Sequence, residues 1–206
     1  MQSSKIGVQI VSSGILSEDT LMLGESHLRK WQIPQGQTVQ LKFGAYRGDV
    51  KVIPVQRYDG MRISQALAAR LGLHAPCTLR MRYRRANRQL ALGPVVGVLV
   101  SRDYPHSSDR PFGAITGFCR ELVDAANMMG GAVYVLTPSM LGSSISRLDV
   151  WVWADGWRRA KAPAPDVVNN RLTTRKLENK SSVQHFFREV KSRFGTQVFN
   201  EKFLDK

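Results

Sequence analysis

The sequence predicts an α+β protein in which a small β-barrel is followed by a small open α/β sheet. As far as Leu92, the chain reads as many short strands with only one clear helix, a pattern that favours a small barrel. Beyond Leu92, continuous apolar runs alternate with amphipathic helices, as in sheets that are covered on both faces. We therefore expect two domains, a β-barrel of residues 1–92 and an α/β domain of residues 93–206.

Alternating apolar and polar residues indicate the strands of the first half. The clearest alternating segments are residues 5–11, 37–44 and 49–55. Residues 77–92 read as a hairpin whose arginines face outward and whose Tyr83 faces the core. The single helix is expected between Ser64, which can cap its first turn, and Gly72, which can end it. No internal repeat is evident.

The second half is expected to contain a right-handed βαβ unit, a hairpin and a further strand–helix–strand unit. The expected elements are a strand at 95–100, a helix at 115–129, a strand at 132–138, a hairpin at 148–163, a strand at 166–172, a helix at 181–195 and a strand at 196–200. Glycines end both helices, and the hairpin turns at Asp155 and Gly156. These elements form a small open sheet with helices between its strands.

A strongly basic composition points to an anionic partner. The 206 residues contain 30 Lys and Arg against 16 Asp and Glu, which gives a formal net charge of +14. Nucleotide phosphates, nucleic acid, acidic polymers and acidic protein surfaces are all candidates, because charge alone does not choose among them.

Three further features indicate a cytoplasmic protein. No apolar run is long enough to span a membrane, and the N-terminus does not read as a signal peptide. Cys77 and Cys119 are far apart in apolar segments and are interpreted as reduced, buried thiols.

The motifs of several enzyme classes are absent from the sequence. It has no P-loop, no dinucleotide-binding glycine motif, no H-E-x-x-H or C-x-x-C pair and no G-x-S-x-G elbow. The polar loop that holds Asp103, His106 and Asp109 is interpreted as a solvated loop rather than as an acid–base cluster. We therefore assign no catalytic residue and no metal ligand.

Polar residues follow the third strand of the predicted α/β sheet. Open α/β sheets bind ligands beyond the carboxyl ends of their strands, and arginine can hold a carboxylate or phosphate with two parallel hydrogen bonds. The candidate residues for binding a substrate or anion here are Asn170, Arg171, Arg175 and Lys176. Arg110 precedes the first helix of the sheet, whose backbone N–H groups form a second candidate anion site.

The densest positive charge lies in the string RMRYRRANR. The predicted basic surface patch consists of Arg80, Arg82, Arg84, Arg85 and Arg88. Nucleic-acid binding is one interpretation of this patch. A solvated or protein-facing edge is favoured, because Tyr83 points toward the core and no exposed aromatic side chains offer a stacking platform for bases.

The order of several segments is distinctive. The second half contains LGPVVGVLVS, FGAITGFCRELVDAANMMGGAVYVLTP, DGWRRAKAPAPDVVNNRL and FNEKFLDK, and the first half contains WQIPQGQTVQLKFG, RISQALAARLGL and LRMRYRRANRQLALGP. In this order the segments resemble the front of the endospore coat-associated ATP-grasp proteins of the YheC/YheD type. The resemblance implies a Rossmann-like pre-ATP-grasp domain from about Gly93 onward, behind the β-barrel that often precedes it in that family.

The family resemblance also implies a reaction type. ATP-grasp enzymes join a carboxylate to an amine or similar nucleophile through an acyl-phosphate, with ATP and Mg²⁺. After the PDVV strand the family has Asn or Asp, then Arg, then another Arg, and Asn170, Arg171 and Arg175 occupy those places here. The catalytic ATP-grasp domain that follows the FN..FL.K segment in the family is absent from these 206 residues.

We therefore expect a non-catalytic front part of such a protein, forming a wall of a substrate or partner site. ATP and Mg²⁺ are expected only with the missing ATP-grasp domain, and this chain alone is not expected to turn over substrate. The expected partners are that missing domain or a partner subunit, and acidic spore-coat proteins. The alternative prediction is a freestanding basic binding module that docks on acidic coat proteins or nucleic acid.

Overall fold

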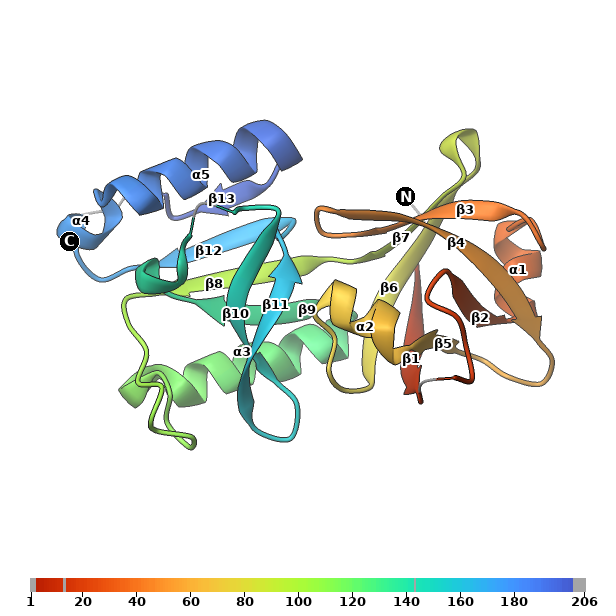
Figure 1. The fold of residues 1–206 in the computed structure, drawn as a ribbon, viewed down its shortest axis with the longest axis horizontal. Coiled ribbons are helices and arrows are strands. Elements are labelled where there is room, and N and C mark those ends of the chain that lie inside the picture. The colour runs from red at the N-terminus through yellow and green to blue at the C-terminus, as the bar shows by residue number, and fades with distance from the viewer. Residues whose placement is uncertain (1–2, 13, 143, 202–206) are drawn as a thin grey trace.

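The computed structural model describes residues 3–12, 14–142 and 144–201 and consists of a closed barrel and a second, open sheet (Figure 1). The barrel has seven strands and the open sheet has six. The predicted α+β fold, with an N-terminal barrel before an open α/β sheet, is confirmed. Most of the FNEKFLDK segment, which carries part of the family resemblance, lies outside the described residues.

The barrel is built from short strands with two short helices. Its elements are β1 (Ser4–Val11), β2 (Thr20–Gly24), α1 (Glu25–Trp31), β3 (Thr38–Phe43), β4 (Tyr46–Val55), β5 (Met61–Ser64), α2 (Gln65–Leu71), β6 (Cys77–Arg84) and β7 (Gln89–Gly93). The strand order around the barrel is β1-β5-β2-β4-β3-β7-β6, and β6 pairs with β1 to close it. Tyr83 faces the core, as predicted, and is 7% exposed.

Helix α1 was not predicted from the sequence. Gly24 precedes it and has no side chain to cap the first turn, and Leu28 is its one fully buried residue. The helix therefore lacks both a capping signal and an apolar stripe, the two features by which a helix is recognised in a sequence. Helix α2 has both, because the Ser64 side chain accepts a hydrogen bond from Leu67 N and three of its residues are buried.

The barrel contains an internal repeat that the sequence analysis missed. Residues 20–44 and 60–84 form the same strand–helix–strand unit at a displacement of 40 residues, so that β2, α1 and β3 correspond to β5, α2 and β6. Each helix ends at an equivalent left-handed residue, Gln32 in one unit and Gly72 in the other. Only one aligned pair of residues is identical, so the repeat preserves the apolar pattern without preserving residue types.

Strand pairing repeats in the same way. β1 runs parallel to β5 with Val8 opposite Met61, and β4 runs parallel to β2 with Val52 opposite Leu21. β1 is also antiparallel to β6, as β4 is to β3. The two units are therefore intertwined, and β7 lies between the equivalent strands β3 and β6.

The second sheet has the strand order β11-β10-β9-β8-β12-β13. Its elements are β8 (Val95–Val100), α3 (Thr116–Met129), β9 (Ala132–Leu136), β10 (Arg147–Trp153), β11 (Trp157–Pro163), β12 (Val167–Arg171), α4 (Arg175–Glu178), α5 (Ser181–Phe194) and β13 (Gln197–Phe199). Strands β9, β8, β12 and β13 are parallel, and the β10–β11 hairpin adds antiparallel strands at one edge. Figure 1 shows α3 and α5 on opposite faces of this sheet.

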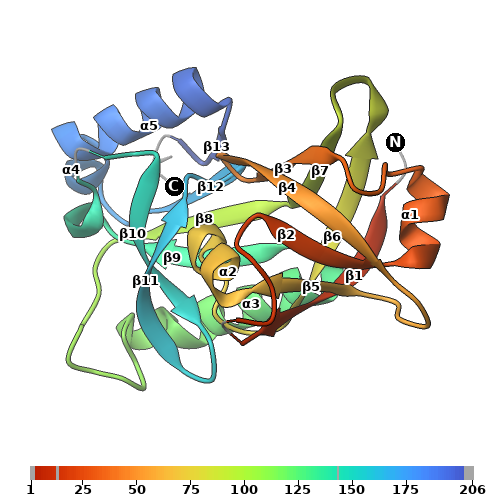
Figure 2. The same cartoon turned by 45° about the vertical axis from the view of Figure 1, so that its right-hand side comes forward.

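Direct contacts join the barrel to the second sheet. Ala45 N donates to Ala164 O at 2.8 Å. The Asp166 carboxylate accepts from Lys42 Nζ at 2.8 Å and from Val95 N at 2.9 Å. Figure 2 shows α2 lying between the barrel and the β10–β11 hairpin. The predicted boundary near Leu92 lies just before β7 ends, and the division into two domains at that point stays a prediction.

Candidate functional site

The carboxyl ends of β8 and β12 form the topological switch point of the second sheet. Helix α3 leads from β8 to β9 on one side, and α5 leads from β12 to β13 on the other. Ligands of open α/β sheets bind in the crevice at this position. Here the hydroxyl oxygens of Ser101 and Thr173 lie 2.9 Å apart, and Thr173 N donates to Ser101 Oγ at 3.1 Å. The base of the candidate site is therefore polar and hydrogen-bonded.

The buried side chain of Asn170 forms hydrogen bonds that stabilise the end of β12. Its side chain is buried, with a relative exposure of 6% for the residue. The amide Nδ2 donates to Glu178 Oε1 and to Asn200 O, both at 2.9 Å. Its Oδ1 accepts from Leu172 N at 3.1 Å. Because these bonds use both donors and one acceptor, Asn170 holds the strand end in place and is not presented to a ligand.

Arg171 is the predicted residue that the structure presents at this edge. It is exposed, and its guanidinium carbon lies 5.1 Å from the centroid of the Phe118 ring, on the first turn of α3. The neighbouring Cys119 is buried, which raises the pKa of its thiol to about 11, while the Arg171 charge opposes that shift. The Arg171 guanidinium thus packs against the Phe118 ring at the start of α3, while the residue stays exposed to solvent.

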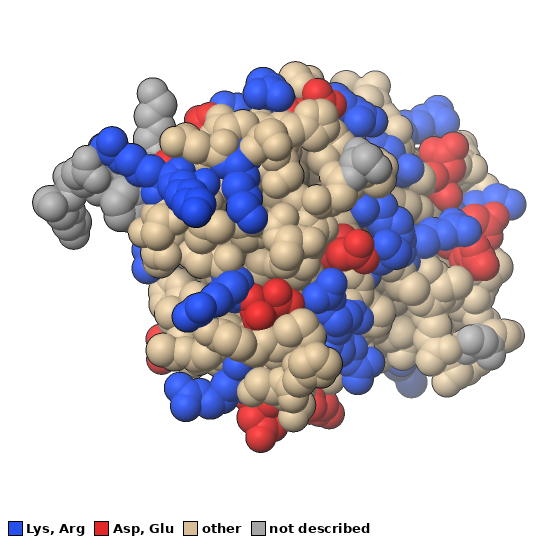
Figure 3. Space-filling view, turned by 60° about the vertical axis from the view of Figure 1, so that its left-hand side comes forward, with Lys and Arg blue, Asp and Glu red and all other residues tan. Residues whose placement is uncertain are grey.

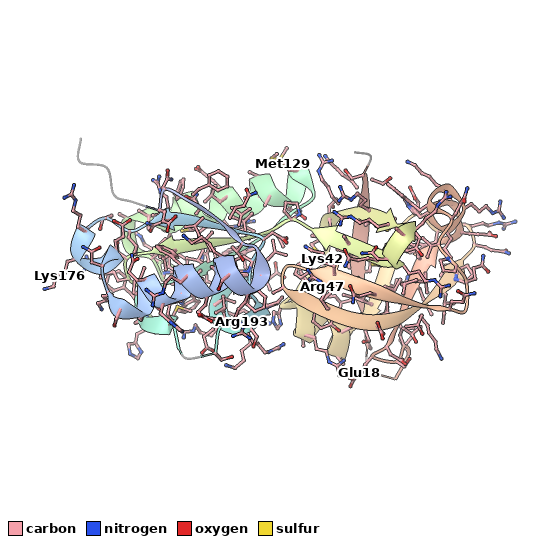
Figure 4. The ribbon with its side chains drawn as sticks, turned by 90° about the horizontal axis from the view of Figure 1, so that it is seen from above. Glu18, Lys42, Arg47, Met129, Lys176 and Arg193 are labelled. Atoms are coloured by element: carbon pink, nitrogen blue, oxygen red, sulfur yellow. The ribbon has the colours of Figure 1, made fainter. Side chains whose placement is uncertain are left out.

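Arg175 and Lys176 lie on α4, a short helix that the sequence did not predict. Thr174 caps this short helix, because its hydroxyl accepts from Leu177 N at 3.3 Å. Figure 4 shows Lys176 projecting from the end of the molecule. Figure 3, which turns this end toward the viewer, shows basic side chains spread over the face with fewer acidic ones. Arg171, Arg175 and Lys176 therefore lie at or just after the carboxyl end of β12.

Arg110, the second predicted anion contact, lies in the loop between β8 and α3 and is exposed. Its carbonyl accepts from Gly113 N at 3.0 Å. A short 3-10 turn, Gly113–Ile115, separates it from α3. The loop is anchored by Phe112, whose ring is edge-on to Trp157 at 4.9 Å. Arg110 therefore does not directly adjoin the first turn of α3.

Asp103 contributes a contact that sequence reasoning did not find. Its carboxylate is 8% exposed and turns inward from the loop after β8. Asp103 Oδ2 accepts from Trp151 Nε1 at 2.9 Å and from Arg159 Nη1 at 3.2 Å. This interaction joins the loop to the β10–β11 hairpin. His106 is exposed, so the loop is neither wholly solvated nor arranged as an acid–base pair with Asp103.

The predicted arginine patch divides into two parts. Arg80, Arg82 and Arg84 line a groove of about 300 Å³ on the outside of the barrel. Lys42 lines the same groove from β3, a contribution that only the strand register reveals. The other two residues of the patch, Arg85 and Arg88, belong to the turn between β6 and β7.

A second cavity, of about 360 Å³, lies between the barrel and the second sheet. Its polar lining is largely paired. Arg120 forms an ion pair with Asp124 and stacks over the Trp153 ring at 4.3 Å, while Asn127 Oδ1 accepts from Thr78 N. The cavity contains the Cys77 thiol, and burial raises its pKa to about 12, so it remains protonated at neutral pH.

Comparison with known proteins finds a distant relative. The chain is similar to the endospore coat-associated protein YheD of Bacillus subtilis (strain 168), with 27% identity over 116 residues. The match covers 56% of this chain and 25% of the relative, so it spans about a quarter of that protein's length. No protein-family model and no solved structure matches the chain. The comparison therefore supports a distant relationship to a spore coat-associated protein.

No three His, Cys, Asp or Glu side chains in the described part of the chain lie together as they would around a metal ion. None of the helices formed by those residues combines the length and apolarity that crossing a lipid bilayer requires.

Proposed function

We propose that the chain is the non-catalytic front part of a spore coat-associated, ATP-grasp-type protein. In this proposal the carboxyl edge of the second sheet forms one wall of a site for an anionic substrate. The observation that carries it is the position of Arg171, exposed at the switch point and held over Phe118.

In this proposal the carboxyl edge of the second sheet binds the anionic substrate and does not catalyse its reaction. A guanidinium presents a planar fork of donors that matches a carboxylate or phosphate in two parallel hydrogen bonds. Arg171 supplies that fork, while Asn170 fixes the backbone on which it stands through its bonds to Glu178, Asn200 and Leu172. ATP and Mg²⁺ are handled by an ATP-grasp domain, supplied by a further part of the protein or by a partner subunit.

Two independent observations support this reading. The segment order resembles ATP-grasp proteins of the spore coat-associated type, and the similar curated protein is named as coat-associated. The open sheet also places a basic residue where doubly wound sheets receive ligands.

The test measures substrate use by the protein joined to its ATP-grasp domain. We expect Arg171→Ala to raise the KM for the anionic substrate about tenfold, because a bidentate contact is lost. Arg171→Lys should recover part of the loss by keeping the charge without the fork. Arg188→Ala is the matched control, since the side chain of this exposed arginine on α5 makes no hydrogen bond or ion pair with the described residues. An unchanged KM in folded Arg171→Ala would remove Arg171 from the site.

The alternative, a freestanding basic binding module, is supported by a different surface. The groove lined by Arg80, Arg82, Arg84 and Lys42 lies on the barrel, away from the carboxyl edge of the second sheet. Figure 4 shows Lys42 at the junction of the two halves and Lys176 at the far end.

A further inference from the structure

The groove on the barrel follows strand β7, and we name it the β7 groove. Its floor is formed by the outward-facing residues Ala91 and Gly93, which have small side chains or none. On one side Arg82 is the cross-strand neighbour of Ala91, and on the other side Lys42 is. Because adjacent strands lie about 4.8 Å apart, the Cα atoms of these two residues lie about 10 Å from each other across the floor.

The internal repeat places one cation at equivalent positions on the two walls of the groove. Strands β3 and β6 are equivalent in the two units, and β7 is inserted between them. At the displacement of 40 residues, Lys42 on β3 corresponds to Arg82 on β6. The walls of the groove are therefore two copies of one strand, each turning a cation toward β7.

The cations of the groove are not neutralised by equal numbers of carboxylates. Asp166 is the one acidic residue that lines the groove among the described residues, and it pairs with Lys42 at 2.8 Å. Arg80 is oriented by hydrogen bonds from Nε to Met129 O and from Nη1 to Ser3 Oγ, neither of which removes its charge. The Arg84 side chain makes no hydrogen bond or ion pair with the described residues. The groove therefore carries a net positive charge.

The spacing of the arginines favours a particular kind of anion. Arg80, Arg82 and Arg84 alternate along β6, and alternate residues of a strand are about 7 Å apart. An extended peptide with acidic residues at every second position has the same repeat. The row spans about 14 Å, which is the length of about four residues of such a peptide. Carboxylates on one face of the peptide would then meet successive guanidinium groups.

The same surface lacks the features that select nucleic acid. Single strands are held by aromatic side chains on which bases stack, as well as by cations. Tyr83, the aromatic residue within the arginine row, is 7% exposed and faces the barrel core. No aromatic residue lines the groove among the described residues.

We propose that the β7 groove binds an extended acidic peptide segment whose carboxylates lie on alternate residues. Guanidinium–carboxylate pairs along β6 provide the register, and the small side chains of β7 allow the peptide backbone to approach. This inference does not depend on Arg171 or on an ATP-grasp partner, so either proposal can fail alone.

The test uses fluorescence anisotropy with a labelled peptide of alternating Glu and Thr. A peptide of the same composition, with its Glu residues in one block, is the control for spacing. We expect the alternating peptide to bind at least about threefold more tightly, with affinity falling as salt is raised. Equal affinity for the two peptides would overturn the proposed register.

A substitution in the floor of the β7 groove tests whether the peptide binds there. Ala91→Glu places a carboxylate between Arg82 and Lys42, where opposite charges on neighbouring strands favour the fold, so the variant should remain folded. We expect it to weaken peptide binding at least about tenfold. Ala125→Glu, at an exposed position on α3, makes the same change in net charge and should retain the affinity. Equal losses in both variants, or none in either, would overturn the site.

A second variant, on β6, tests the β7 groove without changing its floor. Arg84→Gln removes an exposed cation whose side chain makes no hydrogen bond or ion pair with the described residues, so folding should be unaffected, and we expect a loss of affinity of about threefold. A single-stranded oligonucleotide is the competing probe. If it bound more tightly than the alternating peptide and lost that binding in Ala91→Glu, the groove would be a nucleic-acid site and the peptide proposal would be wrong.

Discussion

Burial decides the chemistry of the two cysteines. Cys119 is completely buried on α3, and Cys77 is half-buried at the start of β6. Desolvation disfavours the thiolate and raises the pKa to about 12 for Cys77 and about 11 for Cys119. The sequence-based interpretation of buried thiols therefore holds for Cys119 and only in part for Cys77, and neither thiol suits the role of a nucleophile.

We predict that Cys77 reacts slowly with thiol reagents in the native protein. At pH 8 a thiol with a pKa of about 12 is ionised about a thousandfold less than one with its ordinary value of 9.0. Alkylation followed by peptide mass spectrometry should show that labelling of Cys77 needs denaturant. Rapid labelling of native Cys77 at pH 8 would contradict the buried environment.

The pKa of His74 is lowered, whereas the pKa values of the two cysteines are raised. Desolvation, together with the nearby Arg158 charge, lowers its pKa below the ordinary 6.5. The unfolded chain therefore binds this proton more tightly, so the contribution of His74 to stability is complete above pH 6.5 and is lost as the pH falls through the folded-state pKa. We expect an NMR titration of His74 to have a midpoint below 6.5. A midpoint at or above that value would show that its ring is not desolvated.

At the scale of elements, the two repeated helices end at equivalent left-handed positions with different residues. Gln32 has φ of 51° and Gly72 has φ of 73°. Glycine adopts this conformation without the steric cost that a Cβ atom brings. At Gly72 an added Cβ would also lie 2.8 Å from Ala162 Cβ, on the neighbouring strand β11. Glycine at position 32 should therefore stabilise the protein, whereas replacement of Gly72 should destabilise it.

We predict that Gln32→Gly stabilises the protein by about 0.5–1 kcal/mol, and that Gly72→Ala destabilises it by at least about 1 kcal/mol. Chemical denaturation of both variants measures the two free energies of unfolding. If Gln32→Gly were destabilising, the left-handed cap in the first unit would be wrong, and with it the correspondence of the two helix ends.

The elements that sequence reasoning recovered share a strong local signal. Alternation located the barrel strands, and the apolar stripes of α3 and α5 located the two long helices. Helix α1 was missed because it has neither a capping side chain nor a stripe, and α4 because it is a single turn among polar residues. The repeat was missed because its two units share a pattern of burial and pairing rather than residues.

At the scale of the whole molecule, Asp166 links the barrel to the second sheet. Its carboxylate pairs with Lys42 of β3 and accepts from Val95 N at the start of β8. Both charged side chains are about one-quarter exposed, at 27% and 25%, so their interaction is only partly screened. Removal of the carboxylate leaves a partly buried ammonium group and a backbone donor without their partner.

We predict that Asp166→Ala lowers the free energy of unfolding by about 2 kcal/mol. Asp49→Ala, which removes an exposed carboxylate on β4, is the control and should change it by less than about 0.5 kcal/mol. Thermal and chemical denaturation measure both variants. Equal stability of Asp166→Ala and the control would mean that this contact does not hold the halves together.

The candidate surfaces were predictable only in part. The arginine row of β6 and the exposed Arg171 follow from alternation and from the strand end. The position of Lys42 opposite Arg82 depends on register across three strands, which no local pattern specifies. Likewise, Asn170 was expected to contact a ligand, but its amide is taken up by partners on α4 and after β13 that come together only in the fold.

The central claim is that these residues recognise anions while ATP and Mg²⁺ are handled elsewhere. The most direct measurement is thermal denaturation of the Ala91→Glu chain, in which the β7 groove is blocked, with and without saturating Mg-ATP. The account predicts midpoints that agree within about 1 °C, because the proposed function assigns nucleotide binding to a different domain. A rise of several degrees would reveal a nucleotide site within this chain and would contradict the account.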